Sequence, residues 1–129
     1  MDIQHISTPR AAAPGASYSQ GVVSGELFFT AGFGPADPKT GAIVDGGIRE
    51  QTEQTLDNLE ALLEEVGLDF SDVVKFTVHL ADLHRDFRDF DAAFQGRIAS
   101  PYPARTTVGS TLWNILVEID LVARMRVNG

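Results

Sequence analysis

The 129-residue chain contains no cysteine. This absence excludes disulfides, thiolate metal sites and cysteine nucleophiles. Basic residues are few: 10 Lys and Arg stand against 18 Asp and Glu, so the formal net charge is −8. Because non-specific nucleic-acid binding depends on Lys and Arg that neutralise phosphates, this balance predicts a protein without a nucleic-acid partner.

Long apolar runs and targeting signals are also lacking. No apolar run approaches the roughly 20 residues that span a bilayer, and residues 1–5 do not have the basic and apolar parts of a secretory signal. We therefore expect a cytoplasmic protein without a membrane partner. The three histidines show no metal-ligand spacing, such as a four-residue helical separation, which predicts no metal site.

What is present is a globular composition, with 43% hydrophobic and 22% charged residues, over a length that suits a single domain spanning 1–129. Residue patterns predict strands at 3–7, 20–24, 27–33, 73–81, 106–111 and 115–127, and helices at 48–66 and 84–98. Two helices on one face of a mixed β-sheet satisfy the layering rule for an α+β domain.

Periodicity also predicts which side chains are buried. In the strand 73–81 one face carries Val74, Phe76, Val78 and Leu80, and in the second helix the apolar stripe is Phe87, Phe90, Phe94 and Ile98. Asp82 is the expected N-cap of that helix, and Gly67 the expected end of the first. The acids on the far side of the first helix, which are Glu50, Glu53, Asp57 and Glu64, are most simply a solvated surface.

The last strand leaves one question open. One of its faces carries Ile115, Val117, Ile119 and Leu121, and the other carries Leu116, Glu118, Asp120 and Val122. Both faces hold apolar residues, so the sheet face without helices is expected to be buried against another copy of the chain. The sequence therefore predicts a homo-oligomer.

Arg105 follows Pro103-Ala104 at the start of a strand, and Glu118 lies in the middle of the next, strongly apolar one. A guanidinium keeps its charge and presents a fork that matches a carboxylate. The pattern indicates a site for a small carboxylate. The alternative is a structural ion pair, in which Glu118 pairs with Arg105 or Arg124.

Several motifs together resemble the Rid family, also called YjgF-like or RidA-like proteins. In order, they are Tyr18-Ser19-Gln20, Asp37-Pro38-Lys39-Thr40-Gly41, Gln51-Thr52, Leu56-Asp57-Asn58-Leu59, Gly67-Leu68, Asp72-Val73-Val74-Lys75, Pro103-Ala104-Arg105 and Val117-Glu118-Ile119. The resemblance implies a chorismate-mutase-like fold and a homotrimer with clefts between subunits. It also implies hydrolytic deamination of reactive enamines and imines, such as 2-aminoacrylate, to 2-keto acids and ammonia, without cofactor or metal.

The resemblance assigns roles to particular residues. Arg105 holds the substrate carboxylate, and Glu118 orients a water and moves protons as it attacks the C=N carbon. Tyr18 lines the cleft, the alternative being interface packing, and backbone near Gly32 and Thr107 completes the pocket. The chain departs from the best-characterised deaminase pattern at Ala16-Ser17, Ala31, Phe33, Thr107 and Asp91.

These departures alter the polarity and shape of the pocket. Phe33, where the pattern has an amide, is a candidate specificity residue, although it and Trp113 also suit a core or an interface. Asp91, where the pattern often has Asn, lies beside an apolar stripe and so needs a hydrogen bond or an ion pair. The alternatives to a deaminase are a non-catalytic trimer that binds 2-keto acids, a specialised member that acts on another imine, and a ribonuclease, which the acidic composition opposes.

Overall fold

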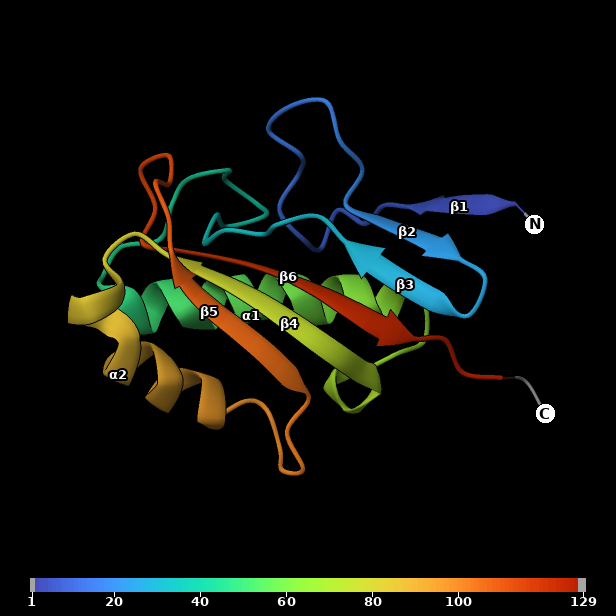
Figure 1. The fold of residues 1–129 in the computed structure, drawn as a ribbon. Helices are drawn as coiled ribbons and strands as arrows, with labels where there is room; N and C mark the ends of the chain where they lie inside the picture. The colour runs from blue at the N-terminus through green and yellow to red at the C-terminus, as the bar shows by residue number, and fades with distance from the viewer. Residues whose placement is uncertain (1, 128–129) are drawn as a thin grey trace.

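The computed structural model describes residues 2–127 and contains a six-stranded sheet with two long helices (Figure 1). In chain order the elements are β1 (Ile3–Ile6), β2 (Gly21–Ser24), β3 (Leu27–Thr30), α1 (Ile48–Glu65), the short 3₁₀ helix η1 (Phe70–Asp72), β4 (Val73–Leu80), α2 (Leu83–Gln95), β5 (Ala104–Gly109) and β6 (Val117–Arg124). No helix in the described part of the chain is long and apolar enough to cross a membrane.

The strand order is β1-β2-β3-β6-β4-β5. All neighbouring pairs are antiparallel except β4 and β5, which run parallel. Because parallel strands need a crossover, α2 and the segment after it carry the chain from the end of β4 back to the start of β5. Both α1 and α2 pack on one face of the sheet, so the predicted α+β architecture with a mixed sheet is confirmed.

The core lies between the helices and one face of the sheet. On β6 the alternation is regular, and its buried residues are Val117, Ile119, Leu121 and Ala123. They pack with fully buried side chains of the other elements, among them Phe28, Leu56, Leu59, Leu62, Phe76 and Phe90. The structure thus settles which of the two faces of the last strand points toward the helices.

The opposite face of the sheet is only partly apolar. It carries Lys75, Thr77 and His79 from β4 and Glu118 and Asp120 from β6, all of them partly exposed. Neither α1 nor α2 covers this face (Figure 1). Its covering by another copy of the chain remains a prediction.

The predicted burial of Val74 is wrong. A β-bulge between Val73 and Lys75 shifts the register of β4 against β6, so Val73 turns into the core and Val74 is 46% exposed. An extra residue in one strand reverses the alternation locally, which a strictly two-residue pattern does not anticipate. From Phe76 to Leu80 the predicted face is correct.

The predicted end of the first helix and start of the second agree with the structure, whereas α2 ends at Gln95 rather than at residue 98. Gly67 takes a positive φ of 74° after α1, and the Asp82 side chain accepts a hydrogen bond from the Arg85 backbone N–H at 3.1 Å. The acids of α1 are not all merely solvated, because Glu53 and Asp57 form ion pairs with Arg97 at 3.1 and 2.9 Å. The C-terminal end of α2 is thereby joined to α1.

Candidate functional site

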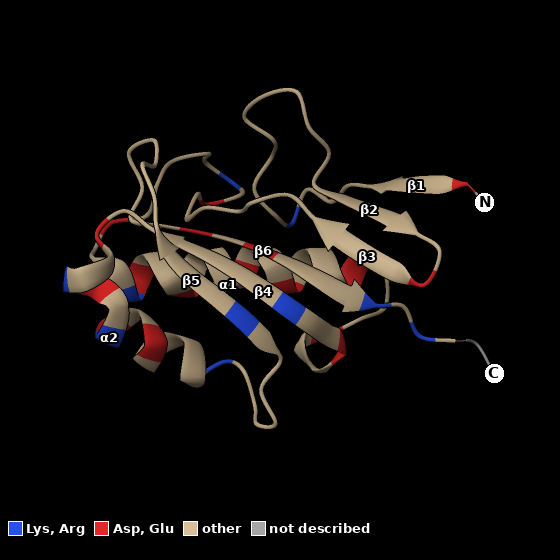
Figure 2. Cartoon of the chain, in the orientation of Figure 1, with Lys and Arg blue, Asp and Glu red and all other residues tan. Residues whose placement is uncertain are grey.

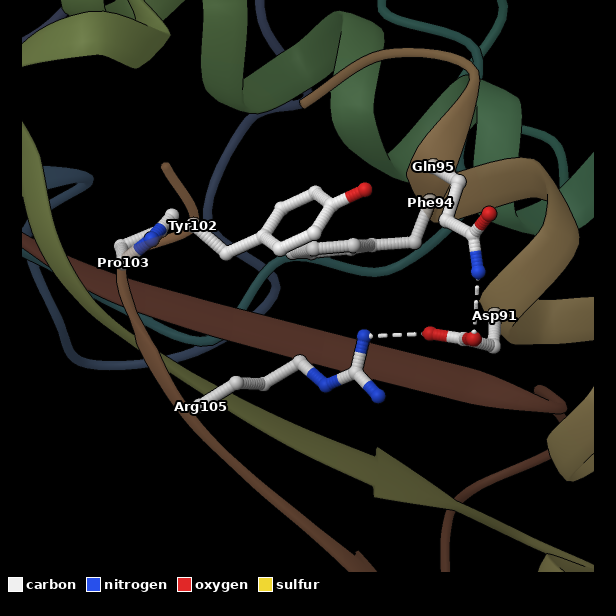
Figure 3. A pocket seen from close by; sticks show the side chains of 6 residues that line it. All are labelled: Asp91, Phe94, Gln95, Tyr102, Pro103 and Arg105. Atoms are coloured by element: carbon white, nitrogen blue, oxygen red, sulfur yellow. Dashed lines mark hydrogen bonds and ion pairs between the residues drawn. The ribbon is translucent and has the colours of Figure 1, made fainter. Parts of the chain in front are cut away.

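Arg105 is the second residue of β5 and lies opposite Phe76 of β4 in the parallel ladder. Phe76 is fully buried under the helices, so the Arg105 side chain also leaves the sheet on the side of α2. There it lines a cavity of about 280 Å³ together with Asp91, Phe94, Gln95, Tyr102 and Pro103 (Figure 3). In Figure 2 the blue bands on β4 and β5 are Lys75 and Arg105, the one Lys or Arg of each strand.

Aromatic rings of α2 surround the guanidinium. Its central carbon lies 4.7 Å from the ring centre of Phe94, 5.4 Å from that of Phe90 and 5.9 Å from that of Phe87. The side chain keeps only 20% of its surface exposed. Cation–π contacts of this kind hold the guanidinium near the phenylalanine rings and leave its N–H donors available for hydrogen bonds. The aromatic stripe predicted for the second helix therefore supports the arginine, although the predicted burial of Phe87 is wrong, since this residue is 40% exposed.

Asp91 is the ion-pair partner of Arg105. Its Oδ1 accepts a hydrogen bond from Arg105 Nη1 at 2.8 Å, and its Oδ2 accepts one from Gln95 Nε2 at 2.8 Å. The hydrogen bond from Arg105 is the main reason why the pKa of Asp91 lies below its ordinary value, and the Gln95 hydrogen bond lowers it further against the effect of burial. Asp91 is therefore ionised at neutral pH.

The ion pair between Arg105 and Asp91 leaves part of the guanidinium available to bind a ligand. Among residues 2–127, Asp91 is the only hydrogen-bond partner of the Arg105 side chain, and it accepts from Nη1. The edge formed by Nε and Nη2 presents two parallel N–H donors, the geometry that binds a carboxylate in a bidentate manner. The cavity thus contains a fixed positive charge with one free face.

Glu118 does not meet Arg105 within the chain. It lies opposite His79 in the β4–β6 ladder, and His79 is three residues beyond Phe76, the partner of Arg105. An odd separation along a regular strand places the two side chains on opposite faces of the sheet. The alternative in which Glu118 pairs with Arg105 or Arg124 does not occur among the described residues of this chain.

Gly32 lies against Glu118. A Cβ atom added at Gly32 would come within 2.8 Å of the carboxyl carbon of Glu118, closer than such atoms approach in real structures. Any larger residue at position 32 would displace the Glu118 side chain from its observed position. The two predicted site residues therefore belong together, on the sheet face without helices.

The other predicted contacts are spread over the structure. Tyr18 is 49% exposed before β2, and its hydroxyl accepts a hydrogen bond from the Gly15 backbone N–H at 3.1 Å. Phe33 is 4% exposed and belongs to the core, where its backbone pairs with Ile119. Thr107 follows Arg105 by two residues on the same side of β5. Neither Tyr18 nor Phe33 lines the Arg105 cavity, and their contacts with substrate stay predictions.

Sequence reasoning missed Gln95 and Tyr102 as neighbours of Arg105. Gln95 follows Asp91 by four residues on α2, a spacing that places both on one side of a helix. Tyr102 lies in the segment that leads into β5 and is largely exposed. The helical spacing was a usable signal for Gln95. Nothing in the local pattern indicated Tyr102. Among the described residues no group of three His, Cys, Asp or Glu is arranged to hold a metal ion.

A second acid, Asp120, has an unusual environment on the sheet face without helices. Burial raises its pKa above the ordinary value of 3.8, and the nearby His79 opposes this in part. A carboxyl group whose pKa is raised by folding binds its proton more tightly in the folded state. Its contribution to stability is therefore lost as the pH rises through the unfolded value toward the folded one.

We predict that Asp120→Asn raises the thermal unfolding midpoint by a few degrees at pH 7, because the variant removes a charge that folding disfavours. The gain should shrink as the pH falls toward 3.8, where the wild-type carboxyl becomes protonated. Differential scanning fluorimetry over this range measures both effects. Asp45→Asn, at an exposed position, is the control. Equal shifts in both variants, or a gain that persists at low pH, would contradict the prediction.

The fold and the arginine-anchored cavity define a small α+β domain with a candidate site for an anionic ligand. A family model described as Endoribonuclease L-PSP matches residues 8–125. The chain thus belongs to this family, the Rid or YjgF-like proteins that its motifs resemble.

Curated relatives and solved structures agree with this assignment. A RutC family protein of Pyrococcus abyssi is 39% identical, in an alignment that covers 92% of this chain and 94% of the relative. The chloroplastic Reactive Intermediate Deaminase A of Arabidopsis thaliana is 36% identical, in an alignment that covers 93% of this chain and 65% of the relative. The crystal structure of RidA from the Antarctic bacterium Psychrobacter sp. has a TM-score of 0.90 at 35% identity and covers 95% of the chain and 99% of its own. The crystal structure of Escherichia coli TdcF with bound serine has a TM-score of 0.87 at 29% identity, and the match covers 95% of this chain and 99% of the TdcF chain.

Proposed function

We propose that this protein hydrolyses small 2-imino acids of the 2-aminoacrylate type to 2-keto acids and ammonia. The observation that carries the proposal is the Arg105 guanidinium, which is held in a cavity with its Nε–Nη2 edge free. Two relatives support it: one is named a reactive intermediate deaminase, and the other was crystallised with serine, a small molecule with a carboxylate.

The chemistry needs orientation and proton transfer. Arg105 holds the substrate carboxylate, which fixes the position of the adjacent C=N carbon. A water adds its oxygen to this carbon while Glu118 accepts one proton of the water and passes it to the imine nitrogen, which gives a tetrahedral carbinolamine. Glu118 then accepts the hydroxyl proton of the carbinolamine and transfers it to the nitrogen, so that the C–N bond breaks, ammonia leaves and the C=O bond forms.

The proposal requires Arg105 and Glu118 from different subunits, since one chain places them on opposite faces of the sheet. In the proposed homotrimer the sheet face without helices packs against neighbouring copies, so that Glu118 and Gly32 of one subunit close the cavity around Arg105 of another. The partly apolar, partly polar character of this face suits contact with a second protein surface. We expect a particle with three times the mass of the 13.9 kDa chain.

Glu118→Gln should lower kcat for imine hydrolysis by about 100-fold, the lower end of the usual range for a general acid or base, because the substrate is intrinsically reactive. Binding of pyruvate should persist, since Arg105 is intact. The assay is the rate of 2-keto acid release when a dehydratase generates the imine, with pyruvate binding measured by calorimetry. Unchanged kcat in the variant would exclude Glu118 from proton transfer.

Mixed trimers test the shared site directly. When Arg105→Ala and Glu118→Gln chains are unfolded together and refolded, roughly a quarter of the sites in randomly mixed trimers combine an intact Arg105 with an intact Glu118 from different chains. Activity should return toward that fraction of the wild-type value. Each variant refolded alone is the control. No recovery in trimers shown to be mixed would contradict a site between subunits.

The separation of Arg105 and Glu118 favours one other function, a non-catalytic trimer that binds 2-keto acids through Arg105 alone. Such a protein binds pyruvate but releases 2-keto acid no faster than the uncatalysed reaction in the same assay. A ribonuclease, which the description of the family model names, is opposed by the net charge of −8, because this charge repels phosphates.

A further inference from the structure

The Arg105 cavity is not simply cationic. Asp91 contributes a carboxylate whose Oδ1 is 2.8 Å from Arg105 Nη1, and both residues line the same cavity (Figure 3). The two side chains are 20% and 29% exposed, so they are partly withdrawn from solvent screening. A ligand bound there meets one positive and one negative group side by side.

We infer that Asp91 is a specificity-determining residue, which makes the site prefer carboxylates with an adjacent protonated nitrogen over 2-keto acids and dicarboxylates. The inference rests on the proposed function, because it assumes that the ligand carboxylate binds Arg105. It goes further by assigning the charge preference of the site to one residue of α2.

The geometry supplies a place for each ligand group. The Nε–Nη2 edge of Arg105 takes the carboxylate, since only Nη1 is engaged by Asp91. Each oxygen of Asp91 accepts one hydrogen bond within the chain, from Arg105 or from Gln95. A carboxylate offers about four acceptor positions, so Asp91 retains lone pairs for a protonated iminium or ammonium beside the ligand carboxylate.

The same arrangement disfavours other ligands. A keto oxygen at the position of the nitrogen brings no proton for Asp91, and a second carboxylate in the cavity meets a like charge at short range. Asp91 remains ionised at neutral pH because Arg105 lowers its pKa. An asparagine in this place would still accept from Arg105 through its amide oxygen, but it would carry no charge.

The test compares three ligands by calorimetry on the full-length protein at pH 7.5. L-Alanine carries the ammonium, pyruvate replaces it by a keto group, and 2-oxoglutarate adds a second carboxylate. In Asp91→Asn the ratio of the L-alanine Kd to the pyruvate Kd should rise about fivefold, the upper end of the range for an exposed ion pair. The affinity for 2-oxoglutarate should increase. Asp91→Ser, which also removes the charge, should shift the ratio in the same direction.

Asp89→Asn is the matched control, because it removes the same charge from an exposed position of the same helix that does not line the cavity. Its three Kd values should equal those of the wild type. Ratios within twofold of the wild type in both Asp91 variants, while Arg105→Ala abolishes binding of all three ligands, would overturn this inference and leave the proposed function intact. Arg105→Ala that binds all three ligands normally would overturn both.

Discussion

Arg105→Ala should lower kcat/KM for imine hydrolysis on the order of a thousandfold. A bidentate, charge-assisted contact supplies two hydrogen bonds of about 2 kcal/mol each, and every 1.4 kcal/mol corresponds to a factor of ten. The loss also removes the orientation of the C=N carbon, so kcat and KM should both change. The measurement is 2-keto acid release from an imine generated in the assay, followed over a range of imine concentrations.

Two further variants define what the arginine provides. Arg105→Lys keeps the positive charge but loses the planar fork, so it should recover only a small part of the activity. Arg49→Ala removes an exposed arginine near the start of α1 and should leave the kinetics unchanged. Circular dichroism checks that each variant is folded. Wild-type kinetics in a folded Arg105→Ala protein would refute the proposed anchor and, with it, the proposed function.

Phe76→Ala should destabilise the fold by about 3–5 kcal/mol, the usual cost of deleting a buried aromatic ring. Phe76 is fully buried on β4, and its ring lies 5.1 Å from that of Phe94 in an edge-to-face arrangement and 6.2 Å from that of Phe70. The cavity left by the ring opens beneath the aromatic residues that hold Arg105. Urea unfolding at a fixed protein concentration measures the loss of stability.

Val74→Ala is the matched comparison on the same strand. Strict alternation gives Val74 and Phe76 the same environment, but the bulge leaves Val74 46% exposed. Its replacement should therefore change the free energy of unfolding by no more than about 0.5 kcal/mol. Comparable losses in the two variants would mean that Val74 is buried in solution, for example by another subunit, and would contradict its exposed placement.

Much of the fold follows from sequence patterns that act locally. Helix periodicity identified α1 and α2 to within a few residues, and the glycine after α1 and the aspartate before α2 placed their nearer boundaries. The bulge in β4 was not predicted. Its extra residue is defined by the pairing with β6 and cannot be recognised from the alternation of apolar and polar residues in β4 itself. Long-range pairing decides such details.

The candidate site was less accessible from sequence than the fold. Arg105 stood out because its guanidinium fork matches a carboxylate, and the structure places its side chain at a cavity. The sequence did not identify its partner within the chain. Glu118 is the nearer acid in the sequence pattern, yet the strand order inserts β4 between β5 and β6 and the alternation of β6 turns Glu118 away. Asp91, which α2 brings over β5, takes that place.

The three phenylalanine rings around the guanidinium also matter for protein engineering. These contacts do not involve position 91, so we expect the arginine to stay near the rings when the side chain at that position is replaced. A library restricted to α2 residues 91 and 95 would therefore sample different ligand preferences on an unaltered scaffold. Variants that bind amines, amides or larger acids become accessible to selection without rebuilding the sheet.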